Sequence, residues 1–348
     1  MSNRADRAAE FLLGTVHFLV DFTCTALLTA SCVSVRGVSA ALCAVVYNGF
    51  AFAMQLPIGY LADRLSLRRT LAAGGCVLVA VGSLVANPLA LCIFIGLGNA
   101  CFHVGGGRES LHCGGTRAAR IGRFVAPGAI GIFLGPLSAG KAMLVFRFAP
   151  LLLVLFAFLL LAQKPKNVQK EKLPAAASAP LRLFVLCGCM FLTVLLRSYM
   201  GTVTRYAALS ETWFAALLIL SVFFGKFFGG SLADRFGAFR FSLIAQPVGT
   251  ALFALSTVQP VLALPATLLF NTTMAITAHT LYRCAPHRSG TMFGLTTLAL
   301  YLGVLPQLLG VPNPLFTWWG LALIGLGSTA LLLLGLWLAQ REEKCLAC

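Results

Sequence analysis

The chain has 348 residues, of which 59% are hydrophobic and only 10% are charged, and its mean hydropathy is +0.90. This composition excludes an ordinary soluble globular protein. The formal net charge of +16 fits loops that set membrane topology and attract anionic lipids, so we expect no nucleic-acid partner.

The apolar residues form long runs such as "LLLVLFAFLLLA" at 151–162. A helix needs about 20 apolar residues to cross the hydrocarbon core, and continuous hydrophobicity favours helices over barrel strands. The sequence therefore predicts an all-α integral membrane protein. We expect the first apolar run to be retained as a span, because it is longer than a signal-peptide core. The twelve predicted spans are roughly 11–33, 38–61, 70–86, 88–107, 120–140, 142–162, 181–203, 212–233, 239–258, 260–282, 290–310 and 315–339.

The basic residues predict the orientation. With the N-terminus in the cytoplasm, most of the 26 Lys and Arg residues fall in cytoplasmic segments, as the positive-inside rule requires. We therefore expect a multi-pass protein of the plasma (inner) membrane with both termini cytoplasmic.

A short polar string occurs twice. "GYLADRLSLRRT" at 59–70 returns as "GSLADRFGAFRF" at 230–241, each at the end of the second span of a six-span set. The basic, then Pro/Ala-rich stretch 163–180 separates the two sets and predicts a cytoplasmic linker. We expect pseudo-symmetric six-helix bundles at 1–162 and 181–348, as in transporters built from parallel halves.

In both copies an Asp ends a helix, where the macrodipole disfavours a carboxylate unless a cation or another helix N-terminus meets it. This pattern predicts a latch between packed helices that engages and releases. The alternative is a plain positive-inside loop. The predicted latch residues are Gly59, Asp63, Arg64, Arg68, Gly230, Asp234 and Arg235.

These strings resemble the signature loop of the major facilitator superfamily, roughly Gly-x-Leu-Ala-Asp-Arg-x-Gly-Arg-Arg/Lys. The first copy departs at Ser66, where the family has Gly, and the second copy has Gly237 there. The resemblance implies two six-helix bundles that rock around a central site, and a loop at Asp63 that locks them on the cytoplasmic side in one state.

The fifth span contains "GRFVAPGAIGIFLGPLSAG", which is similar to the span-5 signature of the superfamily's proton-coupled exporters. Gly131 and Gly135 provide a flat packing face, and Pro136 bends the helix; with Gly140 they are the predicted gating residues. The alternative is a Gly-rich helix that only packs.

Ionisable residues inside a membrane are costly and usually functional. His17 and Asp21 lie four residues apart on one helical face, and Asp21 is the acid nearest mid-membrane. We expect this pair to bind and release the coupling proton; the alternative is a static ion pair or polar anchor. Arg197, in the equivalent span of the second half, is expected to pair with Asp21 or with an anionic substrate, and the sequence does not choose between them.

Other polar residues complete the predicted site. His103 precedes three glycines, which predict a helix break that lines a cavity, with a packing histidine as the alternative. Asn271 and Thr272 are expected to join Arg197 and His103 in binding substrate. Arg108 and Glu109 are expected to form a surface pair, and Lys226 to snorkel to the boundary.

"HFLVDF" and "LGNACFHVGGG" together resemble fosmidomycin-resistance-type exporters of the same superfamily. That resemblance implies a span-1 His-x3-Asp pattern and a Phe-His pair in span 4. The chain continues with Val104 and Gly105, where the subgroup has Pro and an acid.

The 12 cysteines show no metal-binding or disulfide spacing, and no nucleotide-binding loop occurs, so we expect no metal and no cofactor. The sequence predicts a non-enzymatic, monomeric secondary transporter that exports a small anionic or amphipathic organic molecule in exchange for protons. The alternatives are a proton-coupled symporter or facilitator that imports an organic anion, and a non-transporting receptor or enzyme on the same fold.

Overall fold

The computed structural model describes residues 4–33, 39–163, 180–203, 211–312 and 314–347, and all regular structure in these residues is helical. The first half comprises α1 (Arg4–Val33), α2 (Ala40–Asn48), the π-turn η1 (Gly49–Ala53), α3 (Gln55–Arg64), α4 (Arg69–Gly82), α5 (Pro88–Gly114), α6 (Ala119–Leu137), the π-turn η2 (Leu144–Phe148) and α7 (Ala149–Ala162). The second comprises α8 (Pro180–Val203), α9 (Thr212–Phe236), α10 (Ala238–Leu255), η4 (Pro260–Leu262), α11 (Ala263–Asn271), α12 (Thr273–Cys284), η5 (Pro286–Arg288), α13 (Ser289–Leu308) and α14 (Trp318–Ala347).

Ten helical segments of the described chain are long and apolar enough to cross a membrane. The remaining two predicted spans are α4, an apolar helix too short for that criterion, and the 19-residue α6. Several spans are built from two pieces, because a π-turn or a short break interrupts them, as at η1 between α2 and α3. The predicted all-α membrane fold with twelve spans is confirmed.

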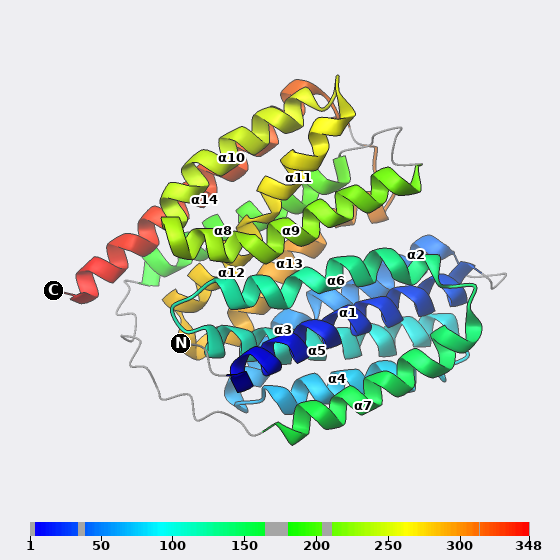
Figure 1. Ribbon diagram of the computed structural model, residues 1–348. Helices are drawn as coiled ribbons and strands as arrows, with labels where there is room; N and C mark the ends of the chain where they lie inside the picture. Colours follow the sequence, from blue (N-terminus) through cyan, green and yellow to red (C-terminus); the bar gives the residue numbers. More distant parts are fainter. Residues whose placement is uncertain (1–3, 34–38, 164–179, 204–210, 313, 348) are drawn as a thin grey trace.

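The helices form two groups that repeat one order of elements (Figure 1). In the first, α1 packs on α6, and α4 packs on α5 and α7; in the second, α8 packs on α13 and α14, and α10 packs on α11 and α14. The groups meet mainly where α6 packs on α9 and where α3 packs on α13. The predicted linker 163–180 falls almost wholly outside the described residues.

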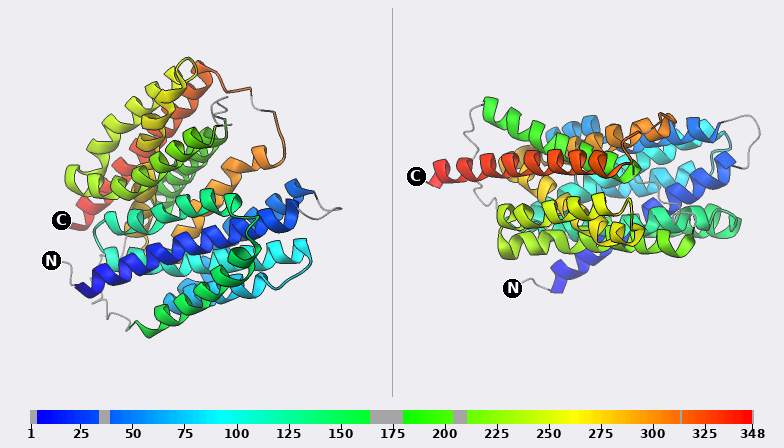
Figure 2. Two further views of the ribbon diagram at one scale, coloured as in Figure 1. Left: turned by 45° about the vertical axis from the view of Figure 1, so that its right-hand side comes forward. Right: turned by 90° about the horizontal axis from the view of Figure 1, so that it is seen from above.

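Both chain ends lie at one end of the molecule, and the helices run roughly along one direction (Figure 2). The two groups are in contact at the end that carries the termini and incline away from each other toward the opposite end (Figure 1). The molecule is therefore closed at the end that the basic residues predict to be cytoplasmic.

The helix break expected at Gly105, Gly106 and Gly107 is wrong, because α5 runs unbroken through them. These glycines instead allow close packing on three neighbours. A Cβ on Gly105 would strike the α4 backbone at Ala72, and one on Gly106 or Gly107 would strike the ring of Phe124 or Phe293. Tertiary packing thus offsets the poor helix propensity of the triplet.

Candidate functional site

Asp21 lies at the centre of a buried polar cluster inside the first group of helices. Its Oδ2 is 3.1 Å from His17 Nε2 on the same helix, and its Oδ1 accepts a 2.8 Å hydrogen bond from Asn99 Nδ2 on α5. His103 Nε2, one turn further along α5, lies 3.7 Å from Oδ1. All four side chains are buried, so the carboxylate interacts with protein groups rather than with bulk water.

Backbone carbonyls orient both imidazole rings. His17 Nδ1 is 2.7 Å from the Phe124 carbonyl oxygen, and His103 Nδ1 is 2.9 Å from that of Asn99. A carbonyl can only accept, so each Nδ1 carries its hydrogen and each Nε2 is turned toward Asp21. The two rings meet edge to face with centroids 4.3 Å apart.

The ligand atoms of His17, Asp21 and His103 lie within 4.8 Å of one another, a spacing that could also hold a metal ion. The 3.1 Å contact between His17 and Asp21 is a hydrogen-bond distance, and Asn99 already donates to the carboxylate. The described contacts are therefore those of a buried hydrogen-bonded cluster.

Glycines of α6 bring that helix against α1 at this cluster. A Cβ on Gly128 would strike Asp21 Oδ2 and His17 Nε2, and a Cβ on Gly131 would strike the α1 backbone. Gly135 continues the same contact one turn later. These glycines thus pack α6 on α1 within their own group, while Gly122 of the same helix packs on the α9 backbone of the other group. Pro136 near the helix end is exposed, and Gly140 lies beyond α6 with no neighbouring atom at its Cβ position.

Arg197 lies in the second group of helices, in the wall of a cavity of about 280 Å³. Its Nη1 donates to Thr273 Oγ1 at 2.8 Å and its Nη2 contacts Met274 Sδ at 3.1 Å. The ion pairs of Asp21 are made with the two histidines, so among the described residues Arg197 and Asp21 form no ion pair. Lys226 of α9 also lines this cavity, contrary to the expectation that it snorkels.

The other predicted substrate-binding residues are divided between the two groups. Asn271 lines the cavity with Arg197, whereas His103 belongs to the Asp21 cluster. Thr272 is buried against Gly229 of α9, and its hydroxyl donates to the Leu269 carbonyl at 2.6 Å. The structure therefore brings Thr273, not Thr272, to Arg197.

Asp63 caps the first turn of α13, a helix of the other group. Its Oδ1 accepts from Gly290 N and its Oδ2 from Thr291 N, each at 2.8 Å. Arg108 Nε lies 3.1 Å from Oδ1, and the same guanidinium donates to the carbonyl of Ala62 in the last turn of α3 and to that of Leu67 in the loop after it. Gly59 permits this approach, because a Cβ there would strike the Gly290 backbone.

Asp234 repeats the arrangement in the opposite sense. Its Oδ1 accepts from Ala118 N at 2.8 Å and its Oδ2 from Ala119 N at 3.0 Å, at the start of α6. A Cβ on Gly230 would strike the Ala118 backbone. Each aspartate thus meets the positive end of a helix from the other group, the arrangement that makes an acid at a helix C-terminus tolerable.

The basic members of the two strings lie on the periphery of these contacts. Arg64 and Arg235 are exposed and lie over the rings of Tyr60 and Phe236. Arg68 Nη1 lies 3.7 Å from Glu109 Oε2, and Arg69 Nη2 lies 2.6 Å from Glu109 Oε1. The expected surface pair between Arg108 and Glu109 is wrong, because both are buried and bind these other partners.

The sequence profile of the Major Facilitator Superfamily matches residues 11–306 of this chain. The chain belongs to this superfamily. Its members and the solved structures that it matches are transporters, so the chain is a multi-pass membrane transporter and not an enzyme. The resemblance of the two Asp-containing strings to the superfamily's signature loop is confirmed at the level of the family.

Solved superfamily structures match nearly the whole chain. The E. coli fucose:proton symporter FucP (N162A) gives a TM-score of 0.70 at 15% identity, covering 96% of this chain and 98% of that one. The human organic anion transporter MFSD10 gives a TM-score of 0.62 at 16% identity, covering 97% of this chain and 100% of that one. A bacterial homologue of the iron transporter ferroportin, in an outward-facing state, gives a TM-score of 0.61 at 15% identity. The match covers 97% of this chain and 99% of that one. A comparison with curated protein sequences found no match to this chain.

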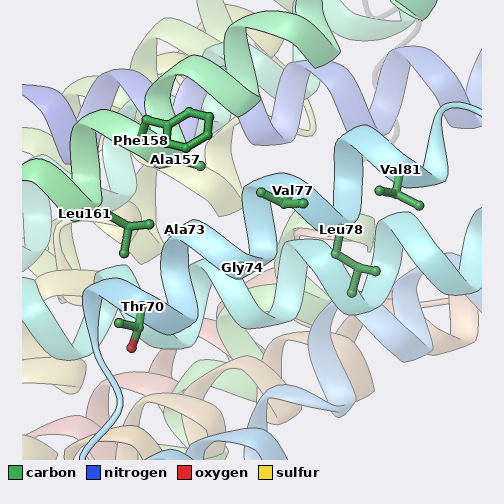
Figure 3. A pocket seen from close by; sticks show the side chains of 9 residues that line it. All are labelled: Thr70, Ala73, Gly74, Val77, Leu78, Val81, Ala157, Phe158 and Leu161. Atoms are coloured by element: carbon green, nitrogen blue, oxygen red, sulfur yellow. The ribbon is translucent and has the colours of Figure 1, made fainter.

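A larger hollow of this superfamily member, about 590 Å³, lies between α4 and α7. Figure 3 shows that it is lined by apolar side chains, among them Val77, Leu78, Phe158 and Leu161, with Thr70 at one end. It has no charged side chain in its lining, and it is separate from both the Asp21 cluster and the Arg197 cavity. An apolar surface of this kind suits contact with lipid chains.

Asn99 and Thr273 are site residues that the sequence analysis missed. Asn99 precedes His103 by one helical turn, so the Asn-x3-His spacing on an apolar helix was the available signal. Thr273 had no such signal, because its neighbours Asn271 and Thr272 are equally polar. The rotation of a helix that begins at Thr273 decides which hydroxyl faces Arg197.

Proposed function

We propose that the chain is a secondary active transporter that exports a small organic anion in exchange for protons by alternating access. The observation that carries this proposal is the buried contact between His17 and Asp21. An ionisable pair in an apolar helix is expensive, and a proton-carrying role explains why it is kept.

The number of hydrogens that the His17–Asp21 pair must hold supports a proton-binding role. His17 Nδ1 must carry a hydrogen to donate to Phe124, and the 3.1 Å contact between Nε2 and Asp21 Oδ2 needs a second hydrogen between those atoms. The pair therefore holds one hydrogen more than a neutral histidine beside a carboxylate. His103 Nε2 provides a neighbouring acceptor, so a proton can leave Asp21 without entering hydrocarbon.

The two aspartate caps support alternating access. Both join the groups at the end that carries the termini, while the groups incline apart at the other end. If the termini are cytoplasmic, as the basic residues predict, this is an outward-facing state with its proton bound. The chain is also similar to FucP in its outward conformation, with a TM-score of 0.68. Proton release to the cytoplasm would follow when the caps separate.

The charge of the Arg197 cavity supports an anionic substrate, because Arg197 and Lys226 bring two cations and its described lining contains no acid. The similar human protein is an organic anion transporter, whereas FucP is a fucose:proton symporter. Symport of an anion is therefore the second candidate. Reversing an imposed pH gradient in liposomes distinguishes it, since an exporter and a symporter move the anion in opposite directions.

A pH-jump current measured on proteoliposomes adsorbed to a solid-supported membrane tests proton coupling without a known substrate. We expect a transient current from the wild type and its loss in Asp21→Asn and His17→Gln. Glu211→Gln, which neutralises an exposed acid at the start of α9, is the matched control and should keep the current. A full current in Asp21→Asn would refute the assignment.

A further inference from the structure

The cavity in the second group of helices contains two basic side chains, Arg197 of α8 and Lys226 of α9. Arg197 is buried and Lys226 is half-buried. Two like charges in one cavity repel each other, and each loses hydration on burial. A ligand that brings negative charge offsets both costs.

The described acids of the transporter lie outside the lining of this cavity. Asp21 contacts the two histidines and Asn99, while Asp63 and Asp234 cap helices. Glu10 and Glu109 are paired with arginines, and Glu211 is exposed at the start of α9. The ion pairs of the described residues include neither Arg197 nor Lys226. Neither cation of this cavity makes an ion pair with a described carboxylate. Asp21 acts on Lys226 electrostatically but lies outside the lining, so the described lining carries a net positive charge.

Arg197 is held in position by neutral groups. Thr273 Oγ1 accepts from Nη1 at 2.8 Å and Met274 Sδ lies 3.1 Å from Nη2, so the guanidinium is oriented without losing its charge. A planar guanidinium fixed in this way suits a carboxylate, which it can bind through two parallel hydrogen bonds. Lys226 adds a compact second charge from a different helix.

The rest of the cavity is mainly apolar. Phe253, Phe270, Leu218 and Val222 contribute to its wall, and Asn271 adds one amide. A ligand that fits this lining has an apolar body and its acidic groups at one end. Small-molecule sites typically combine such a wall with a few placed polar groups.

We propose that this cavity binds a small organic dianion with an apolar body, and that Lys226 determines the preference for two negative charges over one. The inference rests on the proposed function, in which the chain transports an organic anion. It goes further by assigning one charge of the ligand to Arg197 and the second to Lys226.

Three probes with the same ring test the preference: phthalate carries two carboxylates, benzoate one, and benzamide none. Binding to the purified full-length protein is measured by thermal-shift titration at constant ionic strength. We expect the wild type to bind phthalate about tenfold or more tightly than benzoate, as one added charge-assisted hydrogen bond allows, and benzamide more weakly than either.

Lys226→Gln should reduce phthalate binding to the level of benzoate and leave benzoate nearly unchanged, while Lys226→Arg should keep the preference. Lys141→Gln, at an exposed site outside the cavity, is the control and should behave as the wild type. Equal binding of phthalate and benzoate by the wild type, or an unchanged ratio in Lys226→Gln, would overturn the proposal. A wild type that keeps its pH-jump current but shows no dianion preference would refute this inference alone, whereas loss of the current would count against proton coupling.

Discussion

Asp63 and Asp234 make the same contact in opposite directions. Asp63, at the end of α3, accepts from the backbone N–H groups of Gly290 and Thr291 at 2.8 Å, and Asp234, at the end of α9, accepts from those of Ala118 and Ala119 at 2.8 and 3.0 Å. Each half thus caps a helix of the other, and the two caps join the halves at a single end of the molecule. Separation of the halves there must break both.

Hydrogen–deuterium exchange can measure each cap separately. Asp63→Ala should speed exchange in the first turn of α13, and Asp234→Ala should speed it in the first turn of α6. Loss of a cap costs about 1 kcal/mol, which is roughly a fivefold increase in local exchange. Each variant is the control for the other. Two first turns that respond equally to both substitutions would show joint opening rather than independent caps, and no response in either would show that the caps contribute nothing.

The turns after the two aspartates each contain one residue with a positive φ. Ser66 has a φ of +54° and Gly237 a φ of +83°, each three residues after its aspartate. A positive φ destabilises a residue that has a side chain by about 1–2 kcal/mol, whereas glycine adopts it without this penalty. Ser66→Gly should therefore raise the unfolding temperature of the purified protein, and Gly237→Ser should lower it. Shifts of the same sign would contradict this account.

Packing of α6 on α1 at Gly128 leaves no room for a methyl group. A Cβ there would strike the functional atoms of both Asp21 and His17, so Gly128→Ala should displace that pair and abolish the pH-jump current. Overpacking of this kind costs about 1–3 kcal/mol, so the unfolding temperature should also fall. Gly140→Ala meets open space and should change neither quantity. A normal current in Gly128→Ala would show that the His17–Asp21 contact is not needed.

At the closed end, His112 of α5 forms a hydrogen bond with Ser289 of the other group, and we expect this bond to depend on pH. Ser289 Oγ accepts from Arg108 Nε at 3.2 Å and lies 3.0 Å from His112 Nε2, so its own O–H is free to donate to an unprotonated Nε2. Protonation of that nitrogen would remove the bond. The titratable groups around His112 are Asp63, Arg68, Arg108, Glu109 and Tyr282.

Acidification should therefore weaken closure at this end in the wild type, and His112→Gln, which cannot take up the proton, should make closure less sensitive to pH. Distances between spin labels, attached through unnatural amino acids at the ends of α3 and α13, report the closed fraction at each pH. The same pH dependence in wild type and His112→Gln would exclude His112 as the group responsible.

The sequence alone determined the membrane class, the twelve spans and the superfamily, and it pointed to Asp21, His17 and the two Asp-containing strings. The superfamily came from the resemblance of the two strings to its signature loop. The other conclusions follow from local chemistry, because a bilayer requires apolar runs of a certain length and a charged residue within such a run is conspicuous. Chain duplication also leaves its trace in the sequence, because both copies need a Gly and an Asp at the end of a helix.

The tertiary structure alone decided which side chains meet. Asn99 joins Asp21 because α5 lies beside α1, and Thr273 rather than Thr272 reaches Arg197 because of the rotation of α12. The triple glycine of α5 continues a helix because side chains and backbone of α4, α6 and α13 fill the space beside it. Helix rotation and interhelical distance depend on contacts between residues far apart in the chain, and a single sequence carries little record of them.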